Sequence, residues 1–109
     1  MQGSTSEGRD GNAIYDGSRL AARGNVVVVT LQYRLGVLGY LASPAFQIAG
    51  NFGLRDQIAA LQWVRANIAR FRGDPDRVLL FGESAGAVNT CLHLVSPLAA
   101  GLFQRALMQ

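Results

Sequence analysis

The sequence has no lysine, one histidine, one cysteine and few charged residues, which make up 16% of the chain. All ten of its positive charges are arginines, and these are scattered along the chain rather than gathered in one run. Nucleic-acid-binding proteins concentrate positive charge on a patch or a helix. The scatter therefore argues against a nucleic-acid partner, despite a net charge of +3. A single cysteine cannot form an internal disulfide, and we expect Cys91 to be a buried, inert thiol.

Long apolar segments and clusters of metal ligands are also missing. No stretch approaches the roughly 18 apolar residues of a membrane span, so no membrane association is expected. The first residues show no basic stretch followed by an apolar one, so no signal peptide is predicted, and the localisation is left open. Without a Cys/His cluster, a metal site has no support. Half of the 109 residues are hydrophobic, which suits one domain over residues 1–109.

Apolar runs and helical periodicity predict an α/β fold with a parallel sheet. The β-branched run at residues 26–31 and the apolar run at residues 77–82 lack alternation, which is typical of strands covered on both faces. Apolar residues at steps of three and four predict a helix over residues 54–71, begun by Asn51 and with Asp56 near its positive end. Further helices are expected at residues 18–23, ended by Gly24, and at residues 85–95. Residues 1–12 and 32–50 are expected to be mostly loop, and residues 106–109 to start a third strand.

The motif Gly82-x-Ser84-x-Gly86 follows the second predicted strand and precedes a predicted helix. This context is typical of a nucleophile elbow, a sharp strand-to-helix turn that exposes a reactive serine. Such a turn strains the backbone of the serine, and the two glycines make room where strand and helix approach closely. The helix directs its first N–H groups toward a developing oxyanion. Ser84 is therefore the predicted nucleophile, and the backbone N–H of Ala85 the predicted oxyanion donor.

Many short motifs in register make the sequence resemble the type B carboxylesterases, the family of para-nitrobenzyl esterases and cholinesterases. They are Tyr15-Asp16-Gly17, Leu20-Ala21, Tyr33-Arg34-Leu35-Gly36, Gly39-Tyr40-Leu41, Gly50 to Gln57, Ala60 to Val64, Asn67-Ile68, Gly73-Asp74-Pro75 and Phe81 to Ala87. The resemblance implies an α/β-hydrolase fold, of which residues 1–109 form a part. It also implies hydrolysis of small-molecule carboxylic esters through an acyl-enzyme, without a cofactor.

The resemblance assigns only part of the family's machinery to this sequence. Ser84 matches the nucleophile, and Glu83 matches a residue that lines the site beside it. In the family, a His-Gly-Gly-Gly oxyanion loop precedes the matched region, and the catalytic acid and histidine follow it. The resemblance also implies that the strands at residues 26–31 and 77–82 are not neighbours, because the strand between them comes from the preceding region. The 109 residues alone are thus expected to have little or no esterase activity.

Other polar and aromatic residues have simpler interpretations. His93 follows Ser84 by nine residues on one predicted helix, about 13 Å along its axis. It is therefore expected to be a packed or surface histidine rather than the base. Trp63 is expected to pack in the core or between helices, and Asp56 to serve in capping and local hydrogen bonding. Two other functions stay open, namely an inactive relative used for binding or adhesion, and another α/β hydrolase such as a lipase or peptidase. The oligomeric state is not indicated.

Overall fold

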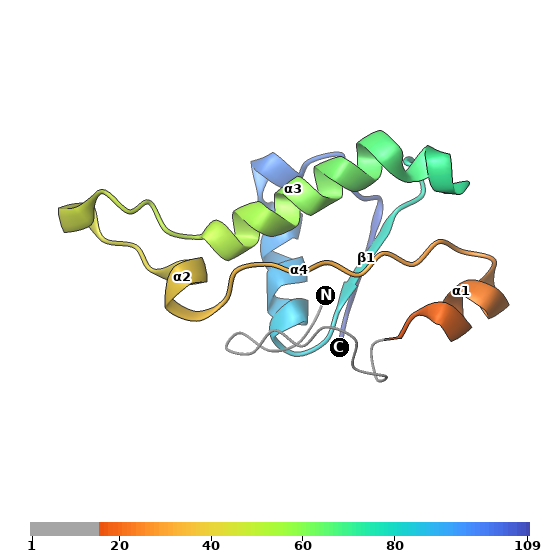
Figure 1. The fold of residues 1–109 in the computed structure, drawn as a ribbon, viewed down its shortest axis with the longest axis horizontal. Coiled ribbons are helices and arrows are strands. Elements are labelled where there is room, and N and C mark those ends of the chain that lie inside the picture. Colours follow the sequence, from red (N-terminus) through yellow and green to blue (C-terminus); the bar gives the residue numbers. More distant parts are fainter. Residues whose placement is uncertain (1–15) are drawn as a thin grey trace.

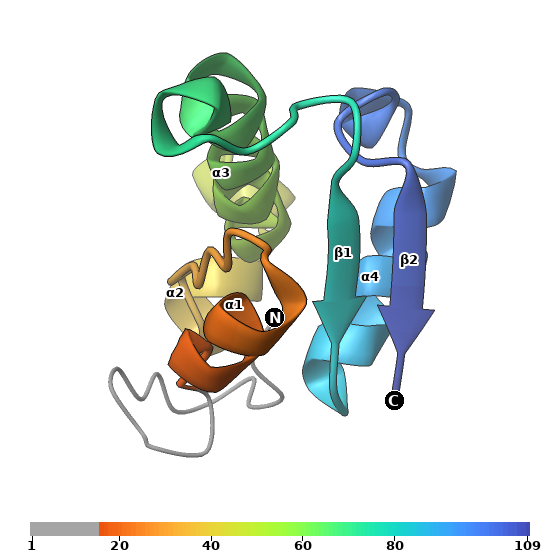
Figure 2. The ribbon, with the colours of Figure 1, turned by 90° about the vertical axis from the view of Figure 1, so that its right-hand side faces the viewer.

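The computed structural model describes residues 16–109, which form a small parallel sheet with helices behind and beside it (Figures 1 and 2). In chain order the elements are α1 (Ser18–Gly24), α2 (Gly36–Tyr40), η2 (Pro44–Phe46), α3 (Phe52–Asn67), η3 (Ile68–Phe71), β1 (Leu79–Gly82), α4 (Ala85–Val95), η4 (Pro97–Ala99) and β2 (Arg105–Met108). The helices predicted at residues 18–23, 54–71 and 85–95 are confirmed, the second with 3-10 geometry in its last turn. The predicted loop at residues 1–12 lies outside the described residues.

The sheet consists of β1 and β2, which pair in parallel from Leu79 opposite Arg105 to Gly82 opposite Met108. Both the strand predicted at residues 77–82 and the one starting at residue 106 are confirmed. Parallel strands require a crossover connection, and α4 makes this connection behind the two strands (Figure 2). The result is a β1–α4–β2 unit, whose first turn contains the Gly82-x-Ser84-x-Gly86 motif.

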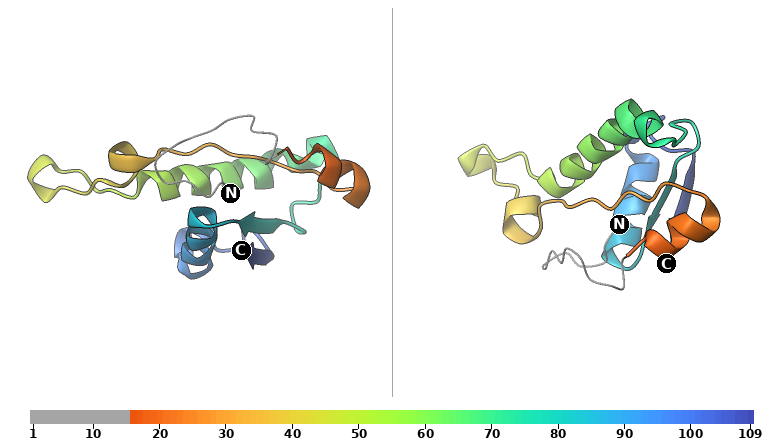
Figure 3. Two further views of the ribbon diagram at one scale, coloured as in Figure 1. Left: turned by 90° about the horizontal axis from the view of Figure 1, so that it is seen from below. Right: turned by 45° about the vertical axis from the view of Figure 1, so that its right-hand side comes forward.

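A small apolar core joins α3 to the β1–α4–β2 unit, beside which α3 runs (Figure 3). Ile58 and Leu61 of α3 meet Leu80 of β1 and Leu102, and Phe103 packs against this cluster. Ile58 and Leu61 belong to the predicted apolar stripe of α3, and Leu80 belongs to the inward face of β1. The core therefore fixes α3 against the strand that leads into the serine motif.

The strand predicted at residues 26–31 is wrong. Residues 25–35 have no regular secondary structure and run as an extended connection (Figure 1). Val26, Val27 and Val29 expose 49%, 41% and 42% of their surface. A β-branched run favours an extended backbone, but a strand also needs a neighbour whose N–H and C=O groups pair with its own. No segment among residues 16–109 provides that neighbour, since β1 pairs with β2 instead.

The prediction that both faces of β1 are covered is also wrong for the described residues. Leu80 and Gly82 are buried, whereas Leu79 and Phe81 expose 49% and 42% of their surface. Helix α4 covers one face of the two strands (Figure 2), so burial alternates along β1.

Residues 32–50 are mostly loop, as predicted, but they include two short helices, α2 and η2, which project away from the sheet (Figure 1). Two cap predictions need correction. The left-handed residue that ends α1 is Asn25, with φ of 49°, and not Gly24. Asn51 precedes α3, but its side chain makes no capping hydrogen bond.

Asp56 does not act at the start of α3, as predicted, but in a long-range ion pair with Arg34. Its carboxylate accepts hydrogen bonds from Arg34 Nε at 2.8 Å, Nη2 at 2.7 Å and the backbone N–H at 3.0 Å. The guanidinium also lies 4.9 Å from the centre of the Phe52 ring. The hydrogen bonds from Arg34 hold the pKa of Asp56 below its ordinary value. The pair ties the end of the extended segment to α3.

Replacement of Asp56 should therefore lower the stability of the fold in a pH-dependent way. A carboxylate with a lowered folded-state pKa stabilises the fold fully above its ordinary pKa of about 3.9, and this contribution is lost as the pH falls through the lower folded value. Asp56→Asn should lower the urea midpoint at neutral pH, and the difference from the unchanged chain should shrink below about pH 4. The control is Asp76→Asn, since Asp76 has one long contact of 3.4 Å to Arg65. An equal effect of both variants would contradict the assignment.

Candidate active site

The chain passes from strand to helix within two residues at Ser84. β1 ends at Gly82 and α4 begins at Ala85, and Ser84 between them has φ of 52° and ψ of −117°. A positive φ is rare outside glycine, and a residue held in such a region costs of order 1–3 kcal/mol. The tight bend that the motif predicts is therefore present, with its strain on the serine.

Backbone hydrogen bonds hold this strained bend. The N–H of Ser84 donates to the C=O of Gln109 at 2.8 Å, and the N–H of Gln109 donates to the C=O of Gly82 at 3.1 Å. On the helix side, the C=O of Ser84 accepts from the N–H groups of Ala87 at 3.0 Å and Val88 at 3.1 Å. Ser84 is thus fixed both to the residue after β2 and to the first turn of α4.

Gly82 is required by the close approach of strand and helix. A Cβ at this position would lie 2.2 Å from the carbonyl oxygen of Gly86 and 2.9 Å from the backbone nitrogen of Ala87. Both are backbone atoms, so a side chain cannot be accommodated by a rotamer change. The expected role of this glycine is confirmed.

Gly82→Ala should destabilise the chain by about 1–3 kcal/mol or more, because strand and helix must move apart. Thermal unfolding followed by circular dichroism would measure the loss. Gly24→Ala is the matched control, since its Cβ would meet Val26 at an ordinary contact of 3.4 Å at a helical position. There alanine should be neutral or stabilising. Equal unfolding temperatures for the two variants would disprove the packing argument.

The positive end of α4 lies beside the exposed side chain of Ser84. Within residues 16–109, the N–H of Ala85, the first of α4, has no hydrogen-bond partner. An unpaired N–H at the N-terminus of a helix favours a negative charge placed before it. The arrangement suits an oxyanion formed at a group attached to Ser84. Glu83 is exposed beside this turn, and its side chain forms no ion pair or hydrogen bond with the described residues.

His93 is not part of this arrangement. Its side chain is almost fully buried, with 3% of its surface exposed, and its Nε2 lies 2.8 Å from Oε1 of Gln57 in α3. The prediction of a packed histidine is confirmed. Since the sequence contains no second histidine, residues 16–109 hold no imidazole base for Ser84.

Burial lowers the pKa of His93. The lowered pKa leads to a second prediction about how stability depends on pH. Protonation of a buried histidine favours the unfolded state. The contribution of neutral His93 to the stability of the fold is therefore complete above its ordinary pKa of about 6.5, and it is lost as the pH falls through the lower folded-state pKa. The unfolding midpoint should therefore drop as the pH falls below about 6.5. His93→Gln should flatten this part of the profile, whereas an unchanged pH dependence in that variant would contradict the prediction.

The inward face of α4 is polar, a feature that the sequence predictions missed. The buried residues of α4 are Gly86, Asn89, Thr90 and His93. Asn89 donates to the Tyr33 hydroxyl at 3.2 Å, and burial raises the pKa of Tyr33. The sequence could have indicated this polar face, because its residues recur at helical spacing. Because this face turns inward, Cys91 is exposed, and the prediction of a buried thiol is wrong.

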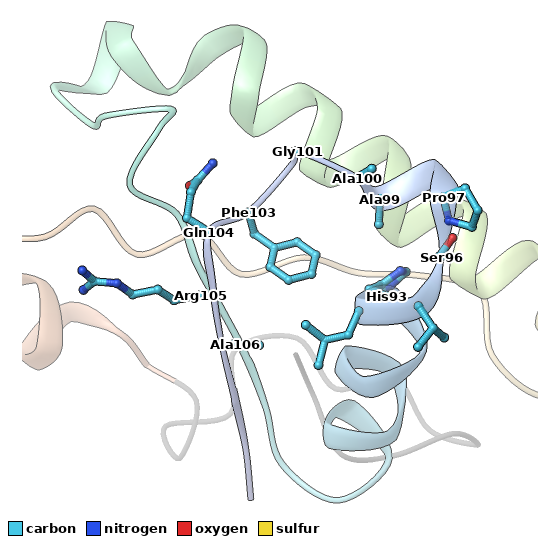
Figure 4. Close-up of a pocket in the computed structure, with 12 residues that line it drawn as sticks. His93, Ser96, Pro97, Ala99, Ala100, Gly101, Phe103, Gln104, Arg105 and Ala106 are labelled. Carbon is cyan, nitrogen blue, oxygen red and sulfur yellow. The ribbon is translucent and has the colours of Figure 1, made fainter.

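Two other features lie away from Ser84. Trp63 exposes 48% of its surface and packs against Phe71, with ring centroids 6.0 Å apart, rather than in the core. A hollow of about 430 Å³ lies between the end of α4 and the start of β2 (Figure 4). It is lined by residues from His93 to Ala106, so it lies at the opposite end of α4 from the serine.

Within residues 16–109, no helix is long and apolar enough to cross a membrane, and no group of side chains could hold a metal ion.

The profile of the Carboxylesterase family matches residues 1–109. The chain belongs to the carboxylesterase family. It is 54% identical over 104 residues to para-nitrobenzyl esterase of Bacillus subtilis, covering 94% of this chain and 21% of that protein. It is 53% identical over 98 residues to bile salt-activated lipase of Mus musculus, covering 90% of this chain and 16% of that protein.

The same similarity holds in three dimensions. The structure superimposes on a carboxylesterase of Geobacillus stearothermophilus with a TM-score of 0.93 and 46% identity, covering all of this chain and 24% of the other. The fold is therefore part of the α/β-hydrolase fold. The chain spans about a fifth of the length of the relatives that it matches.

Proposed function

We propose that this chain contributes the nucleophile to a carboxylic ester hydrolase, and that Ser84 is that nucleophile. The observation that carries the proposal is the strained backbone of Ser84 between β1 and α4, with the unpaired N–H of Ala85 next to it. The family membership supports the same reaction class. The proposed substrates are small-molecule carboxylic esters, in keeping with relatives named as an esterase and a lipase.

The proposed mechanism begins when a base accepts the proton of Ser84 Oγ and the oxygen attacks the ester carbonyl carbon. The N–H of Ala85 stabilises the negative oxygen of the tetrahedral intermediate. The alcohol then leaves with a proton, and a serine acyl ester forms. A water molecule attacks this ester, releases the acid and restores the Ser84 hydroxyl.

The base cannot be His93, because its ring is buried against Gln57. The resemblance to type B carboxylesterases assigns the base, the acid that orients it and further oxyanion donors to regions of the family fold outside the matched segment. We further propose that Glu83 lines the site, since it is exposed next to Ser84. No step of this mechanism requires a cofactor.

The test replaces the matched segment of the Bacillus subtilis para-nitrobenzyl esterase with this chain. The resulting enzyme, called here the replacement enzyme, should hydrolyse p-nitrophenyl esters. Ser84→Ala within it should lower kcat by at least about 10⁴-fold, the scale seen when a catalytic serine is removed. Ser96→Ala is the matched control, because Ser96 lies at the other end of α4 and should leave the rate unchanged.

The 109-residue chain alone should show no steady turnover of the same ester. Steady turnover that disappears in Ser84→Ala would show that a base lies within the chain and would refute this expectation. A replacement enzyme that keeps its rate when Ser84 is changed to alanine would refute the proposed nucleophile. A panel of matched amides, cleaved as fast as the esters, would change the proposed reaction class to peptidase.

A further inference from the structure

The helix that follows Ser84 turns its polar side toward the rest of the chain and its apolar side outward. Asn89, Thr90 and His93 expose at most 4% of their surface. The apolar residues Val88, Leu92, Leu94 and Val95 expose 60%, 43%, 52% and 77%. A helix that packs on a core normally shows the opposite pattern. Within residues 16–109, the side of α4 that contacts other elements is therefore its polar side.

The polar side of α4 is held by hydrogen bonds to two other elements. His93 Nε2 and Gln57 Oε1 are 2.8 Å apart and join α4 to α3, and Figure 4 shows His93 on the last turn of α4. Gln57 is completely buried, and its Nε2 has no partner within residues 16–109. Its bond to His93 is therefore the one hydrogen bond that its side chain makes there. Asn89 Nδ2 donates to the Tyr33 hydroxyl at 3.2 Å, which joins α4 to the extended segment.

A buried hydrogen bond restricts a helix more than apolar contact does. Donor and acceptor must stay within a few tenths of an ångström and near a fixed angle, whereas apolar surfaces tolerate sliding and repacking. A buried polar group that loses its partner is costly. Any rotation or shift of α4 that separated His93 from Gln57 would leave two buried polar groups unpaired. The pair therefore selects one orientation of the helix.

The orientation of α4 reaches Ser84 directly. Ala85 is the first residue of α4, and the C=O of Ser84 accepts hydrogen bonds from the first turn of the helix. A rotation of α4 would move both the Ser84 side chain and the Ala85 N–H.

We infer that Gln57 and His93 are positioning residues, whose buried hydrogen bond sets the orientation of α4 and through it the positions of Ser84 Oγ and the Ala85 N–H. This role rests on the proposed function of Ser84. Neither residue touches the reacting atoms.

The experiment uses the replacement enzyme with active-site titration, in which a p-nitrophenyl phosphonate ester labels each competent serine once. Gln57→Leu and His93→Leu should lower kcat per titrated site about 10- to 100-fold, because a misplacement of about 1 Å costs on this scale. KM should change little. The double variant should be no slower than either single variant, since both remove the same bond.

Two further variants separate positioning from stability. His93→Gln places an amide where the ring Nε2 lies and should restore kcat per site to within about threefold. Val64→Ala removes apolar contact from α3 without touching the pair, because Val64 is a buried residue of the same helix. It should reduce stability while kcat per titrated site stays unchanged. If Gln57→Leu behaves like Val64→Ala, with fewer titrated sites and an unchanged rate at each, the positioning role is refuted and the function of Ser84 stands.

A second measurement does not depend on activity. In the 109-residue chain, Gln57→Leu should shift the backbone amide NMR signals of Ser84 and Ala85, whereas Val64→Ala should leave them in place. Unshifted signals in a folded Gln57→Leu chain would also refute the positioning role. A folded replacement enzyme that hydrolyses no ester would refute the proposed function, and the positioning role would fail with it.

Discussion

The site depends on one backbone constraint, the contact of Gly82 with Gly86 at the point where β1 turns into α4. Without a Cβ at Gly82, the strand can approach the carbonyl of Gly86 closely enough for the chain to reverse within two residues. That reversal forces Ser84 to a φ of 52°. It also brings the serine to the helix end where N–H groups are unpaired. The reactivity proposed for Ser84 thus follows from the packing of one glycine.

Local sequence signals were sufficient to predict an element where its own residues or near neighbours stabilise it. The stripe of Ile58, Leu61 and Val64 predicted α3, because these residues lie on one side of a helix and are buried there. The Gly82-x-Ser84-x-Gly86 motif located the bend, because its glycines report a close backbone approach. The strand after residue 105 was recognisable from its few apolar residues, although only its pairing with β1 makes it a strand.

The predictions failed where the structure depends on groups distant in sequence. The valines at residues 26–29 favour an extended chain, but no sequence pattern supplies the hydrogen-bonded neighbour that a strand requires. Asp56 looked like a residue that interacts with its own helix, yet its partner Arg34 lies 22 residues earlier. Cys91 looked buried because it lies among apolar residues. The side of α4 that turns inward instead carries Asn89 and His93, whose hydrogen-bond partners are on other elements.

The strain at Ser84 is maintained by the β1–α4–β2 unit as a whole, of which the Gly82–Gly86 contact is one part. Helices shorter than about 12–15 residues are marginal on their own in water, and α4 has 11 residues. Its order must come from packing against the sheet. The sheet in turn has two short strands in the described residues, and the bond between Ser84 N–H and the C=O of Gln109 continues their pairing past Gly82. Helix, strands and bend therefore stabilise one another, so the strained serine persists only while all three are formed. A serine in the same five-residue motif without a second strand beside it would lose the hydrogen bond from its N–H to Gln109, which is one of the contacts that hold its positive φ.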